Sequence, residues 1–92
     1  MGKPSLYKER KYSKAIIKFK KASSYYPYMS TPYTGWGVCL SSLGKHDEAI
    51  EKINRALEIF PKGASARLNL ALVLLLKKNE EEALDVLENL KE

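Results

Sequence analysis

The chain contains one histidine, His46, and one cysteine, Cys39, the side chains best suited to general-base and nucleophilic chemistry. Cys39 lies in an apolar segment with no base or second thiol near it in the sequence, which predicts a small buried residue. His46 lies in a predicted turn, which indicates a surface residue. The acidic run from Glu80 to Glu82 is typical of a helix start, where the helix dipole favours negative charge. Metal-ligand spacings and glycine-rich phosphate loops are absent, so the sequence predicts no metal site, no cofactor and no enzyme activity.

Basic residues gather in the first third of the chain. Residues 1–33 have a net charge of +7 and contain all six tyrosines, whereas residues 34–92 have a net charge of −2. Four lysines are spaced by three, four and three residues and therefore form one stripe on a helix: Lys11, Lys14, Lys18 and Lys21. Three interpretations stay open for this basic face: a solvated surface, a contact for an acidic protein surface, or a binding face for nucleic acid or another polyanion. No recognised nucleic-acid motif supports the last of them.

The elements that carry these side chains repeat every 34 residues. Four sets of positions obey this step: Ala15, Ala49 and Ala83; Phe19, Ile53 and Leu87; Leu6, Leu40 and Leu74; and Pro27 and Pro61. Self-similarity at a fixed period indicates one supersecondary unit copied in series, and each unit buries its apolar face only against its neighbours.

The middle copy is the fullest, and it reads Tyr33-x2-Trp36-Gly37-x2-Leu40, then Gly44, Ala49-x3-Ile53, Ala56 and Pro61. This pattern resembles the tetratricopeptide repeat, which is a pair of antiparallel helices. The resemblance covers essentially the whole chain and implies an all-α superhelical array of about two and a half repeats. The repeats are a partial first one over 1–29, a second over 30–63 and a third over 64–92. It also implies a protein-interaction scaffold or adaptor.

Apolar spacing and helix breakers predict five helices, at about 12–26, 32–43, 47–60, 64–77 and 80–91. Residues before Lys11 align with the second half of a missing helix, which predicts only a short helical turn near Leu6. Gly44 suits the left-handed position that follows a helix. Asn79 and Glu82 form a capping-box pattern at the start of the last helix.

The resemblance also implies a candidate site, because the first helix of each repeat in this family lines a concave groove. The implied groove residues are Thr34, Val38 and Ser41 in the second repeat and Leu68, Asn69, Leu72 and Leu75 in the third. The helix at 64–77 is apolar around most of its circumference, so burial of the whole helix between neighbours is the alternative. We expect the groove to hold a peptide or helix of another protein. A clamp for a terminal carboxylate is not expected, since Ser65 and Thr34 are uncharged.

The remaining expectations concern compartment and assembly. The longest apolar stretch, residues 68–76, is far shorter than the ~20 residues of a membrane span, so none is predicted. A single cysteine excludes an internal disulfide and favours a reducing, cytoplasmic setting. Both ends of the array look incomplete, which predicts either a homo-oligomer or part of a longer repeat protein. A protein is therefore the expected partner, ahead of nucleic acid.

Overall fold

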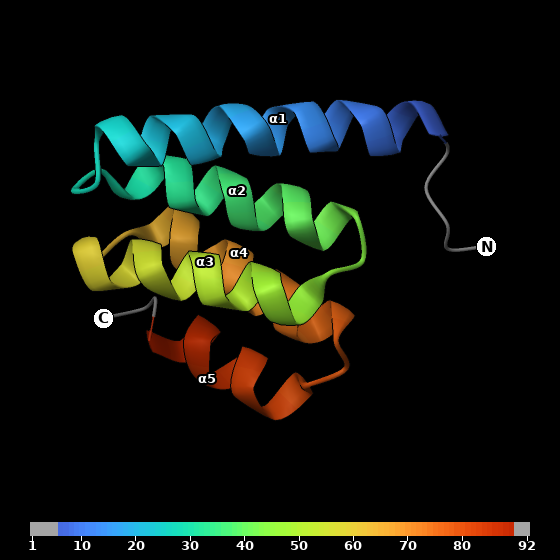
Figure 1. Ribbon diagram of the computed structural model, residues 1–92. Helices are drawn as coiled ribbons and strands as arrows, with labels where there is room; N and C mark the ends of the chain where they lie inside the picture. The colour runs from blue at the N-terminus through green and yellow to red at the C-terminus, as the bar shows by residue number, and fades with distance from the viewer. Residues whose placement is uncertain (1–5, 90–92) are drawn as a thin grey trace.

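The computed structural model describes residues 6–89, which form five helices and, within that range, no strand. The helices are α1 (Leu6–Tyr25), α2 (Ser30–Ser42), α3 (His46–Ile59), α4 (Ala64–Leu76) and α5 (Glu80–Asn89). Each helix packs against the next one along the chain, and α2 also contacts α4. Figure 1 shows α1 along one edge of the stack and α5 along the opposite edge. The predicted all-α array of helix pairs is confirmed.

The turn within each repeat has the same geometry in both copies. Gly44 follows α2 with a φ of 83°, and Lys78 follows α4 with a φ of 68°. In both turns the next amide N–H donates to a carbonyl oxygen in the last turn of the preceding helix, at 2.9 Å in the first and 2.7 Å in the second. The left-handed conformation predicted for Gly44 is confirmed. The predicted cap of α5 is present too, because Asn79 Oδ1 accepts a hydrogen bond from the Glu82 amide at 3.4 Å.

Replacing Lys78 with glycine is expected to raise the free energy of unfolding by about 1 kcal/mol, because the left-handed region strains every residue that has a Cβ. Lys78 is exposed, so the change removes little packing. Urea unfolding followed by circular dichroism measures the difference. The matched control is Gly44→Lys, which introduces the same strain in an open turn with no atom within 4 Å of the added Cβ. A stabilising effect of Gly44→Lys would contradict this account.

Two helices begin two or more residues earlier than predicted. α1 is continuous from Leu6, so the expected short turn followed by a helix from Tyr12 is wrong. Between residues 6 and 25 the chain contains neither glycine nor proline and is rich in Lys, Arg and Ala, which favour helix. α2 begins at Ser30, ahead of the expected start at Pro32. Pro32 still falls in the first helical turn, where a missing N–H breaks no intrahelical hydrogen bond.

The core lies where α2, α3 and α4 meet, and small residues let these helices approach closely. Ala49, Ile53 and Ala56 on α3 are fully buried. Gly37 on α2 has no space for a side chain, since a Cβ there would lie 2.6 Å from Ile53 Cγ1 and 2.9 Å from the Ala49 carbonyl oxygen. The buried cluster is completed by Leu40, Ala66, Leu70, Val73, Leu74 and Ala83. This packing holds α2 and α4 beside each other.

Candidate binding groove

A groove runs between α2 and α4, which are in contact and run in the same direction (Figure 1). Each helix has 13 residues, so the groove is about 20 Å long at 1.5 Å per residue. Two hollows lie along it, one of about 390 Å³ at the beginning of both helices and one of about 100 Å³ nearer their ends. Among the described residues, no charged side chain lines either hollow. We call this strip the α2–α4 groove.

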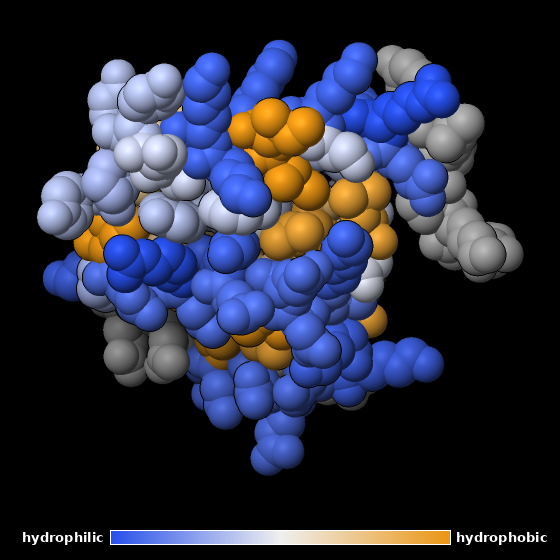
Figure 2. Space-filling view, viewed as in Figure 1, coloured by the Kyte–Doolittle hydropathy of each residue, from blue (hydrophilic) through white to orange (hydrophobic). Residues whose placement is uncertain are grey.

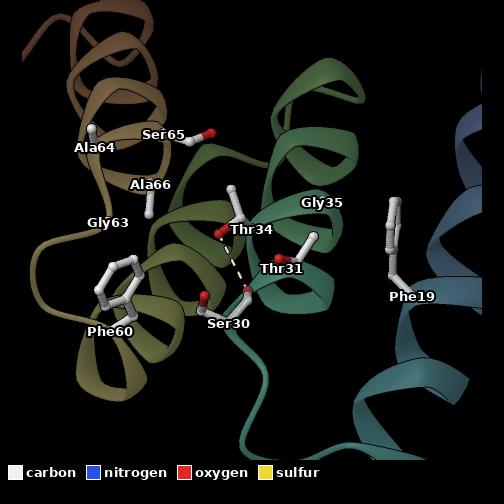
Figure 3. A pocket seen from close by; sticks show the side chains of 10 residues that line it. All are labelled: Phe19, Ser30, Thr31, Thr34, Gly35, Phe60, Gly63, Ala64, Ser65 and Ala66. Atoms are coloured by element: carbon white, nitrogen blue, oxygen red, sulfur yellow. Dashed lines mark hydrogen bonds between the residues drawn. The ribbon is translucent and has the colours of Figure 1, made fainter.

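Two aromatic rings contribute to the lining of the larger hollow, and Figure 3 shows them on opposite sides of the first turns of α2. Phe19 comes from α1 on one side, and Phe60, which follows α3, stands on the other. Gly35 leaves room for the first ring, because a Cβ at that position would lie 2.5 Å from a Phe19 ring atom. The other lining residues are small: Ser30, Thr31, Thr34, Gly63, Ala64, Ser65 and Ala66. This end of the groove therefore combines two aromatic rings with small, uncharged side chains.

Four exposed leucines follow one face of α4, and we call them the leucine row. They are Leu68, Leu72, Leu75 and Leu76, and each exposes between 45% and 55% of its surface. The buried residues of α4 lie between them in the sequence: Ala66, Leu70, Ala71, Val73 and Leu74. The interpretation that the whole helix is buried is therefore wrong, because one face of α4 packs and the other is open. Contiguous exposed apolar surface usually marks an interaction site.

Three polar side chains of the groove are hydrogen-bonded to their own helices. Thr34 Oγ1 donates to the Ser30 carbonyl oxygen at 3.3 Å, and Ser42 Oγ donates to that of Val38 at 3.1 Å. Asn69 Nδ2 donates to the Ser65 carbonyl oxygen at 3.0 Å. These bonds use side-chain hydrogens, so the hydroxyl oxygens and the Asn69 Oδ1 remain as acceptors. The groove therefore offers acceptors to a ligand that brings N–H or O–H donors.

All seven groove residues suggested by the sequence lie on α2 or α4, but the structure divides them between three places. Thr34 lines the larger hollow. The smaller hollow is lined by four of them: Val38, Ser41, Asn69 and Leu72. Leu68 and Leu75 line neither hollow and belong to the exposed leucine row instead.

Most residues that line the two hollows were not predicted from the sequence, and four of them are informative: Ser42, Leu76, Phe19 and Phe60. Ser42 and Leu76 both line the smaller hollow. Each lies four residues after a suggested groove residue, so helical spacing could have identified them. Phe19 and Phe60 lie outside α2 and α4, and no local pattern in the sequence brings them to the groove.

The basic face lies on α1 and contributes to neither hollow. Lys11, Lys14, Lys18 and Lys21 are all exposed. Among the described residues, the ion pairs are those of Arg55 with Glu58 and of Lys77 with Asp47, which leaves these four lysines without a carboxylate partner. The three interpretations of this face therefore remain open at this point.

A further hollow, of about 610 Å³, contains aromatic surface already covered by cations. Tyr33 and Trp36 stack with ring centroids 6.3 Å apart. Lys52 Nζ lies 4.2 Å from the Trp36 centroid, and the Arg55 guanidinium carbon lies 5.8 Å from that of Tyr33. The hydrogen bond from Arg55 to Glu58 raises the pKa of the guanidinium above its ordinary value. Internal contacts thus occupy both rings.

The residues best suited to catalysis lie in structural roles. Cys39 is buried, and burial raises the pKa of its thiol, so it carries less thiolate than an exposed cysteine. His46 Nδ1 lies 3.1 Å from Ser41 Oγ, which links the end of α2 to the start of α3. A nucleophile–base pair needs a third group that orients the base, and in the described part of the chain the side chain of His46 has Ser41 as its one hydrogen-bond partner. The described residues also contain no cluster of metal-ligating side chains.

Comparisons with known proteins agree with the repeat pattern. The family model described as tetratricopeptide repeat matches residues 28–90, about two thirds of the chain. A comparison with curated proteins finds no match. Of the helices described, none has the length and apolar character needed to cross a membrane.

Proposed function

Because this chain belongs to the tetratricopeptide repeat family, whose repeats mediate contacts between proteins, we propose that it is a non-catalytic scaffold that binds an amphipathic segment of a partner protein in the α2–α4 groove. The observation that carries the proposal is the leucine row, four half-exposed apolar side chains on one face of one helix. Burying them against a partner removes apolar surface from water, which is worth roughly 25 cal/mol per Å² before the entropy of association is subtracted.

The chemistry of the groove supports a ligand with one apolar and one uncharged polar side. The leucine row forms an apolar wall on α4, and hydroxyl groups such as Thr34 and Ser41 lie opposite on α2. Since no charged side chain lines the hollows in the described residues, recognition of a phosphate or carboxylate is disfavoured there. A groove about 20 Å long matches a helix of about 13 residues with apolar anchors on one face.

Peptide selection tests this proposal. A phage library of random 16-residue peptides (about one and a half times the groove length) is selected against the protein, and an enriched synthetic peptide is titrated by fluorescence anisotropy. We expect enrichment of apolar residues at three- and four-residue spacing. Leu72→Glu/Leu76→Glu is expected to weaken binding by more than about tenfold, because it places two charges in the apolar contact. The matched control, Leu84→Glu on α5, changes an equally exposed leucine outside the groove and should leave binding unchanged.

Salt dependence separates the groove from the basic face. Groove binding is expected to change little with salt, whereas polyanion binding through the lysines falls linearly with the logarithm of salt concentration. Lys14→Glu/Lys18→Glu should therefore leave the affinity for the selected peptide intact. If that variant lost the peptide and Leu72→Glu/Leu76→Glu kept it, the binding face would be α1, and the proposed function would be wrong.

A further inference from the structure

The first and last helices described carry opposite charges. α1 has a net charge of +6 and α5 has a net charge of −5. They lie at opposite edges of the stack (Figure 1). α1 packs only against α2, and α5 packs only against α4, so each keeps a face that no other described helix covers.

The open face of α1 has an apolar residue at its centre. Ile17 exposes 66% of its surface. Lys14 precedes it by three residues and Lys21 follows it by four, so both lysines are its neighbours on the helix surface. Figure 2 shows apolar surface beside hydrophilic side chains along α1, continuing towards α2. We call these three residues the α1 face.

The open face of α5 has the same arrangement with the opposite charge. Leu84 exposes 59% of its surface, with Glu81 three residues before it and Glu88 four residues after it. In the two preceding repeats the equivalent positions hold Ile16 and Ile50, which are partly buried against the core. Leu84 therefore occupies a helix-packing position that the described residues leave open. We call Leu84, Glu81 and Glu88 the α5 face.

We propose that a second copy of this chain covers each open face, with the α5 face of one molecule docked on the α1 face of the next. Leu84 packs against Ile17, and the two lysines pair with the two carboxylates. Each face has one charged residue three positions before its apolar residue and one four positions after it. Each lysine therefore lies within about 1.5 Å of a carboxylate position along the helix axis, whether the two helices run parallel or antiparallel. A dimer formed in this way still has one free α1 face and one free α5 face. Further molecules can therefore add at both ends, and the assembly grows with concentration.

Charge complementarity is what selects this partner. Exposed ion pairs contribute little each, so the association is weak and sensitive to salt. The charges act mainly on specificity, because α1 against α1 or α5 against α5 would bring like charges together. Only the unlike pairing satisfies both apolar residues and all four charges.

The test is sedimentation equilibrium of the full chain, from about 10 μM to about 1 mM, the range in which weak interfaces associate. At low salt we expect the average mass to rise continuously with concentration and to return towards the monomer at high salt. Lys14→Glu/Lys21→Glu and, separately, Glu81→Lys/Glu88→Lys are each expected to weaken association by roughly tenfold or more, because each opposes like charges. The chain that carries all four substitutions restores opposite charges and should associate again.

Two controls separate a loss of the interface from the effect of a changed net charge and from misfolding of the variants. Lys45→Glu/Lys62→Glu changes the net charge by as much as the α1 variant does but lies outside both faces, and it should associate at least as strongly as the original chain. Circular dichroism must give equal helicity for all variants, since every substituted side chain is exposed. A chain that stays monomeric at the highest concentration and low salt would overturn the proposal. The proposal would also be overturned if the four-substitution chain associated no more strongly than the two double variants, or if the protein formed a dimer that did not grow further with concentration.

Discussion

Replacing Ile53 with alanine is expected to lower the free energy of unfolding by about 2–5 kcal/mol. Ile53 has no exposed surface and lies in the cluster that α2, α3 and α4 share. The change removes buried carbons and leaves a cavity that helices packed on three sides can only partly close. Domains of this size are stable by only about 5–15 kcal/mol, so the loss is a large share of the total. Urea unfolding followed by circular dichroism measures it.

The control for this prediction is the same substitution at an exposed isoleucine. Ile17 on α1 exposes 66% of its surface, so Ile17→Ala should change the stability by no more than about 0.5 kcal/mol. The measurement is made at low protein concentration, where association between copies is negligible. Equal losses for the two variants would mean that Ile53 does not occupy the core in the way described.

Replacing Gly37 with alanine is the second large effect, and it is expected to be destabilising by about 1–3 kcal/mol. Helix propensity alone favours alanine over glycine by about 1 kcal/mol, which acts in the opposite direction. Packing prevails because an added Cβ would lie 2.9 Å from the Ala49 carbonyl oxygen, a backbone atom that cannot turn away. Moving it requires α2 and α3 to separate. Thermal and urea unfolding of the variant measure the net effect.

The third repeat supplies a sharper version of this test. The equivalents of Gly37 and Ile53 are Ala71 and Leu87, so alanine is accommodated where leucine replaces isoleucine. Leucine branches one carbon farther from the backbone and can move its Cγ away from residue 37. In a double-mutant cycle, Gly37→Ala/Ile53→Leu should therefore lose less free energy of unfolding than the two single variants lose in total, by about 0.5–3 kcal/mol. Strict additivity, or a stabilising Gly37→Ala, would contradict the packing described.

The repeat and its turns could be predicted from the sequence because their causes are local. Gly44 favours the left-handed conformation that ends α2, and the 34-residue step places the helix pairs in register. The start of α1 was predicted wrongly for a reason that is also local. Alignment with the other repeats predicted a short helical turn near Leu6 and a separate helix from about Tyr12, but residues 6–25 contain no glycine or proline that would interrupt one helix.

The candidate groove was only partly predictable. Helical spacing identifies Leu72 and Asn69 as members of one face, because that spacing depends only on the helix itself. Apolar residues occur around most of α4, however, and the sequence pattern does not say which of them pack. Their burial depends on where α2, α3 and α5 cross α4.

The sequence by itself therefore determined the all-α repeat, the conformation at Gly44 and the charge of the terminal helices, since each depends on residue type and spacing along the chain. The tertiary structure alone decided that Leu76 is open while Leu74 is buried, and that Phe19 and Phe60 both contribute to the lining of the larger hollow. The physical reason is that exposure and cavity shape arise from contacts between helices that are distant in sequence. No local pattern contains those contacts.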